Sequence, residues 1–167
     1  MPARKHSKPV VPPVDSPERR RLPPLLRRAW HGLNQALRRR IAHTGATPDQ
    51  FIALRYLTES NPKGITQGEL TQLMSSDPNT IASLVERMEA AGLVDRRSHE
   101  TDRRAYRIRL NPSGRRLYLE LRKIAVDLQV GVLAVLPEAQ QENFLIQLTA
   151  IADACRDAAE QSPKRGK

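Results

Sequence analysis

One face of a predicted helix between Asp77 and Gly92 carries short polar and basic side chains at helical spacing. They are Asn79, Thr80, Ser83 and Arg87. Side chains of these types form hydrogen bonds with base edges in the major groove of DNA. A helix that offers them on one face and buries the other is suited to enter that groove. The segment therefore predicts a DNA-recognition helix.

The boundaries and the apolar face of this helix follow from the same segment. Asp77 can cap the first free amides, and Pro78 suits the first helical position because its missing N–H costs nothing there. Gly92 can adopt the left-handed conformation that ends a helix. The apolar stripe recurs at helical spacing and consists of Ile81, Leu84, Val85 and Met88. We expect this stripe to be buried.

A basic hairpin is predicted directly after the helix. An extended segment begins at Leu93, and a second strand runs from Ala105 to Leu110 with alternating apolar and arginine side chains. Between Asp95 and Arg116 eight arginines stand against three acidic residues, a local charge of +5. A charge run alone is typical of a solvated face. Its position after a groove-shaped helix favours contact with nucleic acid.

These features resemble the winged helix-turn-helix of the MarR (multiple antibiotic resistance regulator) family, over about residues 64–114. Asp77-Pro78-Asn79-Thr80 opens the recognition helix, Leu84-Val85-Glu86-Arg87-Met88-Glu89 lies within it, and Gly92-Leu93-Val94 closes it. Asp102-Arg103-Arg104 matches the wing signature. Leu110-Asn111-Pro112-Ser113-Gly114 stands where the family usually has Leu-Thr-x-x-Gly, with Asn111-Pro112 as a small departure.

The resemblance implies a mainly α-helical fold with a small β wing (α+β), and DNA contacts from the wing through Asp102, Arg103 and Arg104. A guanidinium suits a narrow, electronegative minor groove because it is weakly hydrated. Asp102 can hold Arg104 in place through a charge-assisted hydrogen bond. The alternative interpretation of this pair is a surface ion pair of little energetic value.

Five regions are predicted along the chain. The first is Pro-rich and basic, and we expect it to be disordered because it cannot bury enough apolar surface to offset its ordering entropy. An arm that grips phosphates and a solubilising tail are both consistent with its composition. The regions are a basic tail (1–21), an N-terminal dimerisation helix (22–46), a winged helix-turn-helix DNA-binding domain (47–112), C-terminal dimerisation helices (113–162) and a basic tail (163–167).

The helices on either side of the reading head carry long apolar stripes. The stripes are Leu26, Trp30, Leu33, Leu37 and Ile41 in the first helix, Leu117, Leu121, Ile124, Leu128, Val132 and Val135 after the wing, and Phe144, Leu148, Ile151, Ala152 and Cys155 in the last helix. Packing on their own domain is one explanation. We prefer a second copy of the chain as the cover, because a two-fold homodimer would present two reading heads to a palindromic site. The resemblance implies the same arrangement, with the first and last helices entwined.

Within the reading head, Thr66 and Glu69 form a predicted capping box at the start of a helix. Its predicted buried side consists of Leu70, Leu73 and Met74. Ser75 and Ser76 make the turn into the recognition helix, which is the spacing of a helix-turn-helix motif.

Composition supports a polyanionic partner. The 167 residues carry a formal net charge of +10, whereas Leu117 to Ser162 carries −4, so the basic excess lies elsewhere. No apolar run is long enough to span a bilayer, and the N-terminus lacks the apolar core of a signal peptide. One cysteine cannot form a disulfide within the chain. We expect a cytoplasmic protein.

Many members of the family are released from DNA by a small aromatic ligand. Such a pocket could form from residues of the first two helices, namely Trp30, His31, Asn34, Phe51 and Tyr56. Trp30 fits the apolar stripe, which favours a place in the core. Cys155 also lies on a stripe, and we interpret it as a buried small hydrophobic residue.

No metal spacing, cofactor motif or nucleophile–base pair is found in the sequence. An enzyme is therefore the least supported class. The favoured function is a homodimeric, sequence-specific transcriptional regulator, a repressor relieved by a small aromatic ligand. The alternatives are a DNA-binding architectural protein that senses nothing and a helical protein–protein adaptor, which would show no salt-dependent DNA binding.

Overall fold

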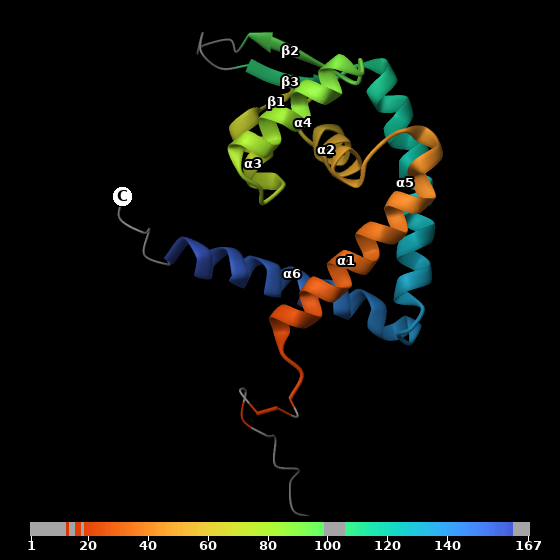
Figure 1. Ribbon diagram of the computed structural model, residues 1–167, viewed down its shortest axis with the longest axis vertical. Coiled ribbons are helices and arrows are strands. Elements are labelled where there is room, and N and C mark those ends of the chain that lie inside the picture. The colour runs from red at the N-terminus through yellow and green to blue at the C-terminus, as the bar shows by residue number, and fades with distance from the viewer. Residues whose placement is uncertain (1–12, 14–15, 18, 99–105, 162–167) are drawn as a thin grey trace, which may run out of the picture. The chain divides into compact units, whose positions relative to one another are not determined.

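The computed structural model describes residues 13, 16–17, 19–98 and 106–161. They form two compact units, divided after Pro48. The first unit contains α1 (Leu22–Ile41) and a short 3-10 helix, η1 (Ala42–Thr44). Helix α2 (Pro48–Glu59) begins at the division, and the second unit continues through a small sheet to two long C-terminal helices (Figure 1).

Helix α1 begins with prolines at its first positions and ends at Ile41. The chain continues directly into η1, a tighter turn of 3-10 helix that contains His43. The lower half of the predicted stripe is buried, at Leu37 and Ile41. The prediction that Trp30 lies in the core is wrong, because its side chain is 52% exposed. Leu33 is exposed as well.

The reading head, which comprises α2 through β3, is built on a three-stranded antiparallel sheet with strand order β1-β3-β2. The strands are β1 (Ile65–Thr66), β2 (Val94–Ser98) and β3 (Tyr106–Leu110). Val94 pairs with Leu110 and Arg96 with Ile108, which places the buried apolar side chains on one face. Helices α3 (Gln67–Leu73) and α4 (Pro78–Ala90) contact this sheet (Figure 1).

The predicted capping box opens α3. The Thr66 hydroxyl accepts from the Glu69 amide at 3.2 Å, and the Glu69 carboxylate accepts from the Thr66 amide at 2.6 Å. Leu70 is fully buried, but the prediction for Leu73 is wrong because its side chain is 41% exposed. Helix α3 is only two turns long, so just one row of its side chains reaches the core.

Helix α4 is capped by Asp77 as predicted. Its carboxylate accepts hydrogen bonds from the amides of Asn79 at 3.1 Å and Thr80 at 2.9 Å, and from the Thr80 hydroxyl. The helix ends at Ala90, and Gly92 adopts the left-handed conformation with φ +65°. These hydrogen bonds satisfy amides that the helix itself leaves free, so the cap fixes where α4 begins.

Asn111 joins the end of α4 to the start of α5 (Pro112–Leu133). Its Oδ1 accepts from the amide of Gly114 at 2.9 Å, which caps α5. Its Nδ2 donates to the carbonyl of Gly92, which follows α4. A Cβ on Gly114 would lie 2.1 Å from the Leu93 carbonyl oxygen, so only glycine allows the two segments to approach this closely.

The long helices α5 and α6 (Glu138–Gln161) differ in burial. Tyr118, Leu121 and Leu128 anchor α5 in the core, and the Tyr118 ring stacks on that of Phe51 with centroids 6.2 Å apart. Helix α6 has no buried residue. The prediction that Cys155 is buried is therefore wrong for the single chain, in which the thiol is exposed.

A prediction concerns the close approach at Gly114. Gly114→Ala should destabilise the fold by roughly 1–3 kcal/mol, because the added methyl group must push the Leu93 backbone, just before β2, away from α5. Gly68→Ala is the matched control: Gly68 is also helical, and its Cβ would meet only Thr66 Oγ1 at 3.9 Å. The control should be neutral or slightly stabilising. Chemical denaturation measures both, and equal stability of the two variants would contradict the assignment.

A second prediction follows from the cap of α4. The Thr80 hydroxyl, and then the amides of Thr80 and Asn79, lower the pKa of Asp77 from 3.8. The folded pKa lies below the unfolded one, so the ionised carboxylate stabilises the fold above pH 3.8. This contribution is lost as the pH falls through the folded value. Asp77→Asn keeps a capping oxygen but cannot ionise.

The thermal midpoint of the parent should therefore fall more steeply than that of Asp77→Asn as the pH is lowered below 3.8. Scanning calorimetry across that range measures both proteins. Parallel curves would mean that the carboxylate charge adds nothing to the cap.

Candidate nucleic-acid interface

The recognition helix is oriented by its apolar stripe. All four predicted stripe residues of α4 are 2% exposed or less, against the rest of the reading head. The opposite face is open to solvent at Asn79, Thr80, Ser83 and Arg87, which are the four predicted base-reading residues. Burial of one face thus fixes the rotation of the helix and turns the polar face outward.

The four residues are not equally free to bind. The Thr80 hydroxyl donates to the Asp77 carboxylate, so this side chain takes part in the cap. Within the described residues, the side chains of Asn79, Ser83 and Arg87 form no hydrogen bond or ion pair. We therefore expect these three to carry most of the base contacts.

Side-chain contacts hold the start of α4 and the base of the hairpin in place. The Gln67 amide donates to the Pro78 carbonyl at 3.3 Å, which ties α3 to the first turn of α4. Arg96 on β2 has its Nε 3.0 Å from Glu89 Oε2 on α4, close enough for an ion pair but not aligned as a hydrogen bond. Both groups are partly exposed, so this ion pair orients the hairpin more than it stabilises the fold.

The two faces of the hairpin have different properties. Asp95, Arg97, Arg107 and Arg109 alternate with the buried residues, so they share the outer face. Arg107 donates to the Gly64 carbonyl at 3.1 Å and is partly held. Tyr106 lies on the same face as Ile108 but is 54% exposed, because it is nearest the tip.

The wing residues Asp102, Arg103 and Arg104 lie outside the described residues, and so do the N-terminal basic residues 1–12. Their assignment to DNA contact stays a prediction.

The five residues predicted to line an effector pocket have different environments. On α1, Trp30 and His31 are exposed, whereas Asn34 Oδ1 is buried and has no hydrogen-bond partner among the described residues. On α2, Tyr56 is half-buried. Phe51 is buried and stacks on Tyr118, which gives it a place in the core.

Within the described ranges, no group of three or more His, Cys, Asp or Glu side chains could hold a metal ion. No helix in that part of the chain is long and apolar enough to cross a membrane.

Sequence reasoning missed the functional potential of two arginine groups. Arg96 occupies a core-side position of β2, which the alternation of the strand could have revealed. Arg109, Arg115 and Arg116 surround the start of α5, but their shared recess depends on how β3 meets that helix. The only sequence signal was the density of arginines around Asn111.

Comparison with known proteins identifies the family. The model of the MarR family matches residues 44–105. YsmB of Bacillus subtilis, named as an uncharacterized HTH-type transcriptional regulator, is 39% identical over 75 residues, which cover 45% of this chain and 50% of YsmB. The chain spans half the length or less of the curated relatives that it matches.

Solved structures match over a longer range. A "probable transcriptional regulator" from Pseudomonas aeruginosa is 31% identical, with a TM-score of 0.67 over 76% of this chain and 93% of that one. CouR from Rhodococcus jostii RHA1 was solved with p-coumaroyl-CoA, at 26% identity and a TM-score of 0.69. The repressor CouR was also solved on a 23-mer DNA duplex, at 25% identity and a TM-score of 0.70. Each CouR match covers 77% of this chain and 89% of that one.

The winged helix-turn-helix fold, the match of the family model and these structural relatives agree with one another. Regulators, and not enzymes, are the class to which the named relatives belong. The chain belongs to the MarR family.

Proposed function

We propose that the chain is a homodimeric transcriptional repressor that reads a palindromic DNA site and is released by a small aromatic ligand. The observation that carries this proposal is the outward polar face of α4, held in place by a fully buried stripe and a capped N-terminus. The DNA-bound structure of CouR supports duplex DNA as the partner.

In this proposal Asn79, Ser83 and Arg87 read base edges, and Thr80 assists from the cap. Arg104 of the wing enters the adjacent minor groove, Asp102 holds Arg104 in place, and Arg103 adds a further wing contact with the DNA. Arg97 and Arg107, on the outer face of the hairpin, provide positive charge near the phosphates. The net charge of +10 favours association with DNA of any sequence, so base discrimination must come from α4.

Dimerisation is supported by apolar surface that the single chain leaves exposed. On α5, Val130 is 63% exposed, in the turn after α5 Val135 is 84% exposed, and on α6, Phe144 is 41% exposed. Apolar side chains at helical spacing on a helix without any buried residue call for a partner surface. A second copy supplies that surface and doubles the reading heads. Regions 22–46 and 113–162 are the proposed dimerisation regions.

The effector part of the proposal is supported by CouR, which was solved with p-coumaroyl-CoA. In this chain, the buried and unpartnered Oδ1 of Asn34 is a candidate polar contact for an aromatic ligand. Trp30, His31 and Tyr56 are the other proposed contacts. Phe51 is buried against Tyr118, so it would support the pocket from behind and would not contact the ligand directly.

The first test addresses base discrimination. Arg87→Ala should lower affinity for the specific site by roughly 1–3 kcal/mol and flatten the preference at particular base pairs, with non-specific affinity nearly unchanged. Arg122→Ala is the matched control, because it removes the same charge from the exposed side of α5. Binding titrations against specific and scrambled duplexes measure both variants. An equal loss on all sequences would make Arg87 a phosphate contact.

The second test addresses the dimer. Phe144→Glu places a charge on the apolar stripe of α6 and should convert the dimer to monomer at low micromolar concentration. Ile146→Glu is the matched control, because Ile146 is 60% exposed and lies about 200° around the same helix. It should leave the dimer intact. Sedimentation velocity measures both, and a parent that sediments as a monomer would refute the proposed assembly.

A further inference from the structure

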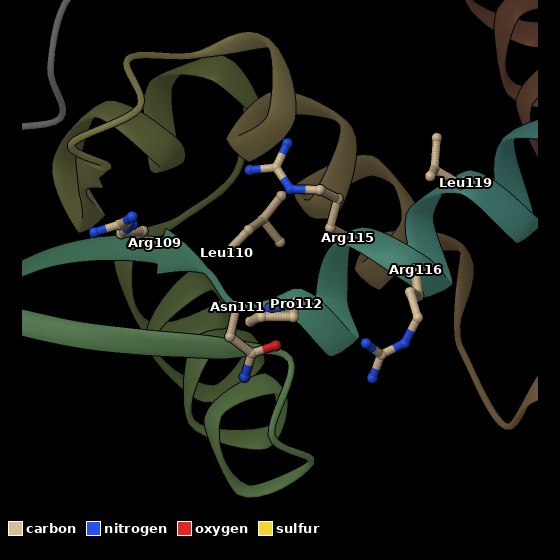
Figure 2. A pocket seen from close by; sticks show the side chains of 7 residues that line it. All are labelled: Arg109, Leu110, Asn111, Pro112, Arg115, Arg116 and Leu119. Atoms are coloured by element: carbon tan, nitrogen blue, oxygen red, sulfur yellow. The ribbon is translucent and has the colours of Figure 1, made fainter.

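A recess of about 450 Å³ lies where β3 meets α5, within the second compact unit. Arg109 and Leu110 come from the end of β3, and Arg115, Arg116 and Leu119 come from the first turns of α5. Asn111 and Pro112 complete the wall. Figure 2 shows Arg109 on the strand, and Arg115 and Arg116 pointing to different sides of the start of α5.

The recess carries positive charge from three arginines that form no ion pair within the described residues, although Asp95 stands opposite Arg109 across the strands. All three guanidinium groups are exposed, and no acidic side chain lines the recess. Within the described residues, Arg109 and Arg115 have no side-chain hydrogen bond or ion pair, and Arg116 donates only to the Ser113 hydroxyl at 3.0 Å. The first turn of α5 contains no acidic residue either. Unpaired guanidinium groups at this density favour an anion that can accept several hydrogen bonds.

The same recess has apolar walls. Leu110 is buried at 8% exposure, and Leu119 is 53% exposed on the helix side. Together with the Pro112 ring they offer apolar surface between the charged groups. A free inorganic ion would leave this surface in contact with water, so the recess fits an anion attached to an apolar body.

The apolar walls favour a small molecule over the DNA backbone as the source of the anion, because a backbone phosphate carries no apolar group to cover them. The recess includes Asn111, which donates to the Gly92 carbonyl just beyond the end of α4. Helix α4 has 13 residues and is therefore about 20 Å long. Asn79, Thr80 and Ser83 lie toward the opposite end of that helix, whereas Arg87 lies in its last turn.

We propose that this recess binds a small organic phosphate, with its phosphate held by Arg109 and Arg115 and its apolar part against Leu110, Pro112 and Leu119. Arg116 supplies further positive charge at the edge. Its lining residues are different from those of the effector pocket proposed on α1 and α2. Its occupancy can be measured on the protein alone, so it does not depend on the DNA-binding proposal.

Three probes separate the two halves of the recess: phenyl phosphate, inorganic phosphate and phenol. Isothermal titration calorimetry on the full-length chain at constant ionic strength measures each one. Phenyl phosphate should bind with a dissociation constant on the order of 1 mM, and both half-probes should bind at least roughly tenfold more weakly. Equal binding of phenyl phosphate and phenol would overturn the phosphate assignment, and absence of phenyl phosphate binding would overturn the site.

Variants locate the binding. Arg109→Gln and Arg115→Gln should each weaken phenyl phosphate about tenfold, because each removes hydrogen bonds to a charged group. Arg122→Gln is the matched control on α5, seven residues beyond Arg115 and outside the recess. It should bind as the parent does. Thermal midpoints check that the variants fold, which is expected because these arginines are exposed.

Binding of the variants to duplex DNA decides whether the site takes a small-molecule phosphate or a phosphate of the DNA backbone. In the absence of any small molecule, Arg115→Gln should bind specific and scrambled duplexes with the affinity and salt dependence of Arg122→Gln. A smaller salt slope for Arg115→Gln alone would identify a DNA phosphate contact and overturn the proposal. If Arg122→Gln lost phenyl phosphate binding to the same extent, the effect would come from the overall charge of the protein, and the proposed site would be overturned as well.

Discussion

Burial of the α4 stripe is the constraint on which the rest of the reading head depends. Ile81, Leu84, Val85 and Met88 are sealed from solvent by the sheet and the neighbouring helices. A helix with one face sealed cannot rotate about its axis without exposing apolar surface, at a cost of about 25 cal/mol per Å². The identity of the outward residues is thus decided by the inward ones. Asp77 adds the second restraint, because its cap fixes the residue at which the helix begins.

The sequence predicted the reading head well because its signals are local. The cap at Asp77, the capping box at Thr66 and the left-handed Gly92 each depend on residues within one turn of one another. The alternation of β3 predicted one apolar face, and Ile108 and Leu110 on that face are buried. The prediction that Leu73 is buried was wrong, because periodicity does not show how many turns of a short helix reach the core. Tyr106 lies on the same face of β3 as Ile108 and Leu110, but it is exposed because the helices do not cover that end of the strand.

Periodicity was less informative outside the reading head. The stripes of α1 and α6 have the spacing of buried faces, yet Trp30, Phe144 and Cys155 are exposed in the single chain. A stripe shows that a surface is apolar, but it does not say which surface covers it. The arginine recess was beyond prediction for a related reason. Arg109 and Arg115 line one recess because the capped turn at Asn111 joins the end of β3 to the start of α5.

The double role of Asn111 has a mechanical consequence. One amide side chain caps α5 and also holds the carbonyl that follows α4, and Gly114 packs α5 tightly against Leu93. The two helices therefore meet at a stiff joint. Helix α5 has 22 residues and extends for about 33 Å beyond that joint. At this joint the direction of the polar face of α4 is therefore tied to the direction of α5.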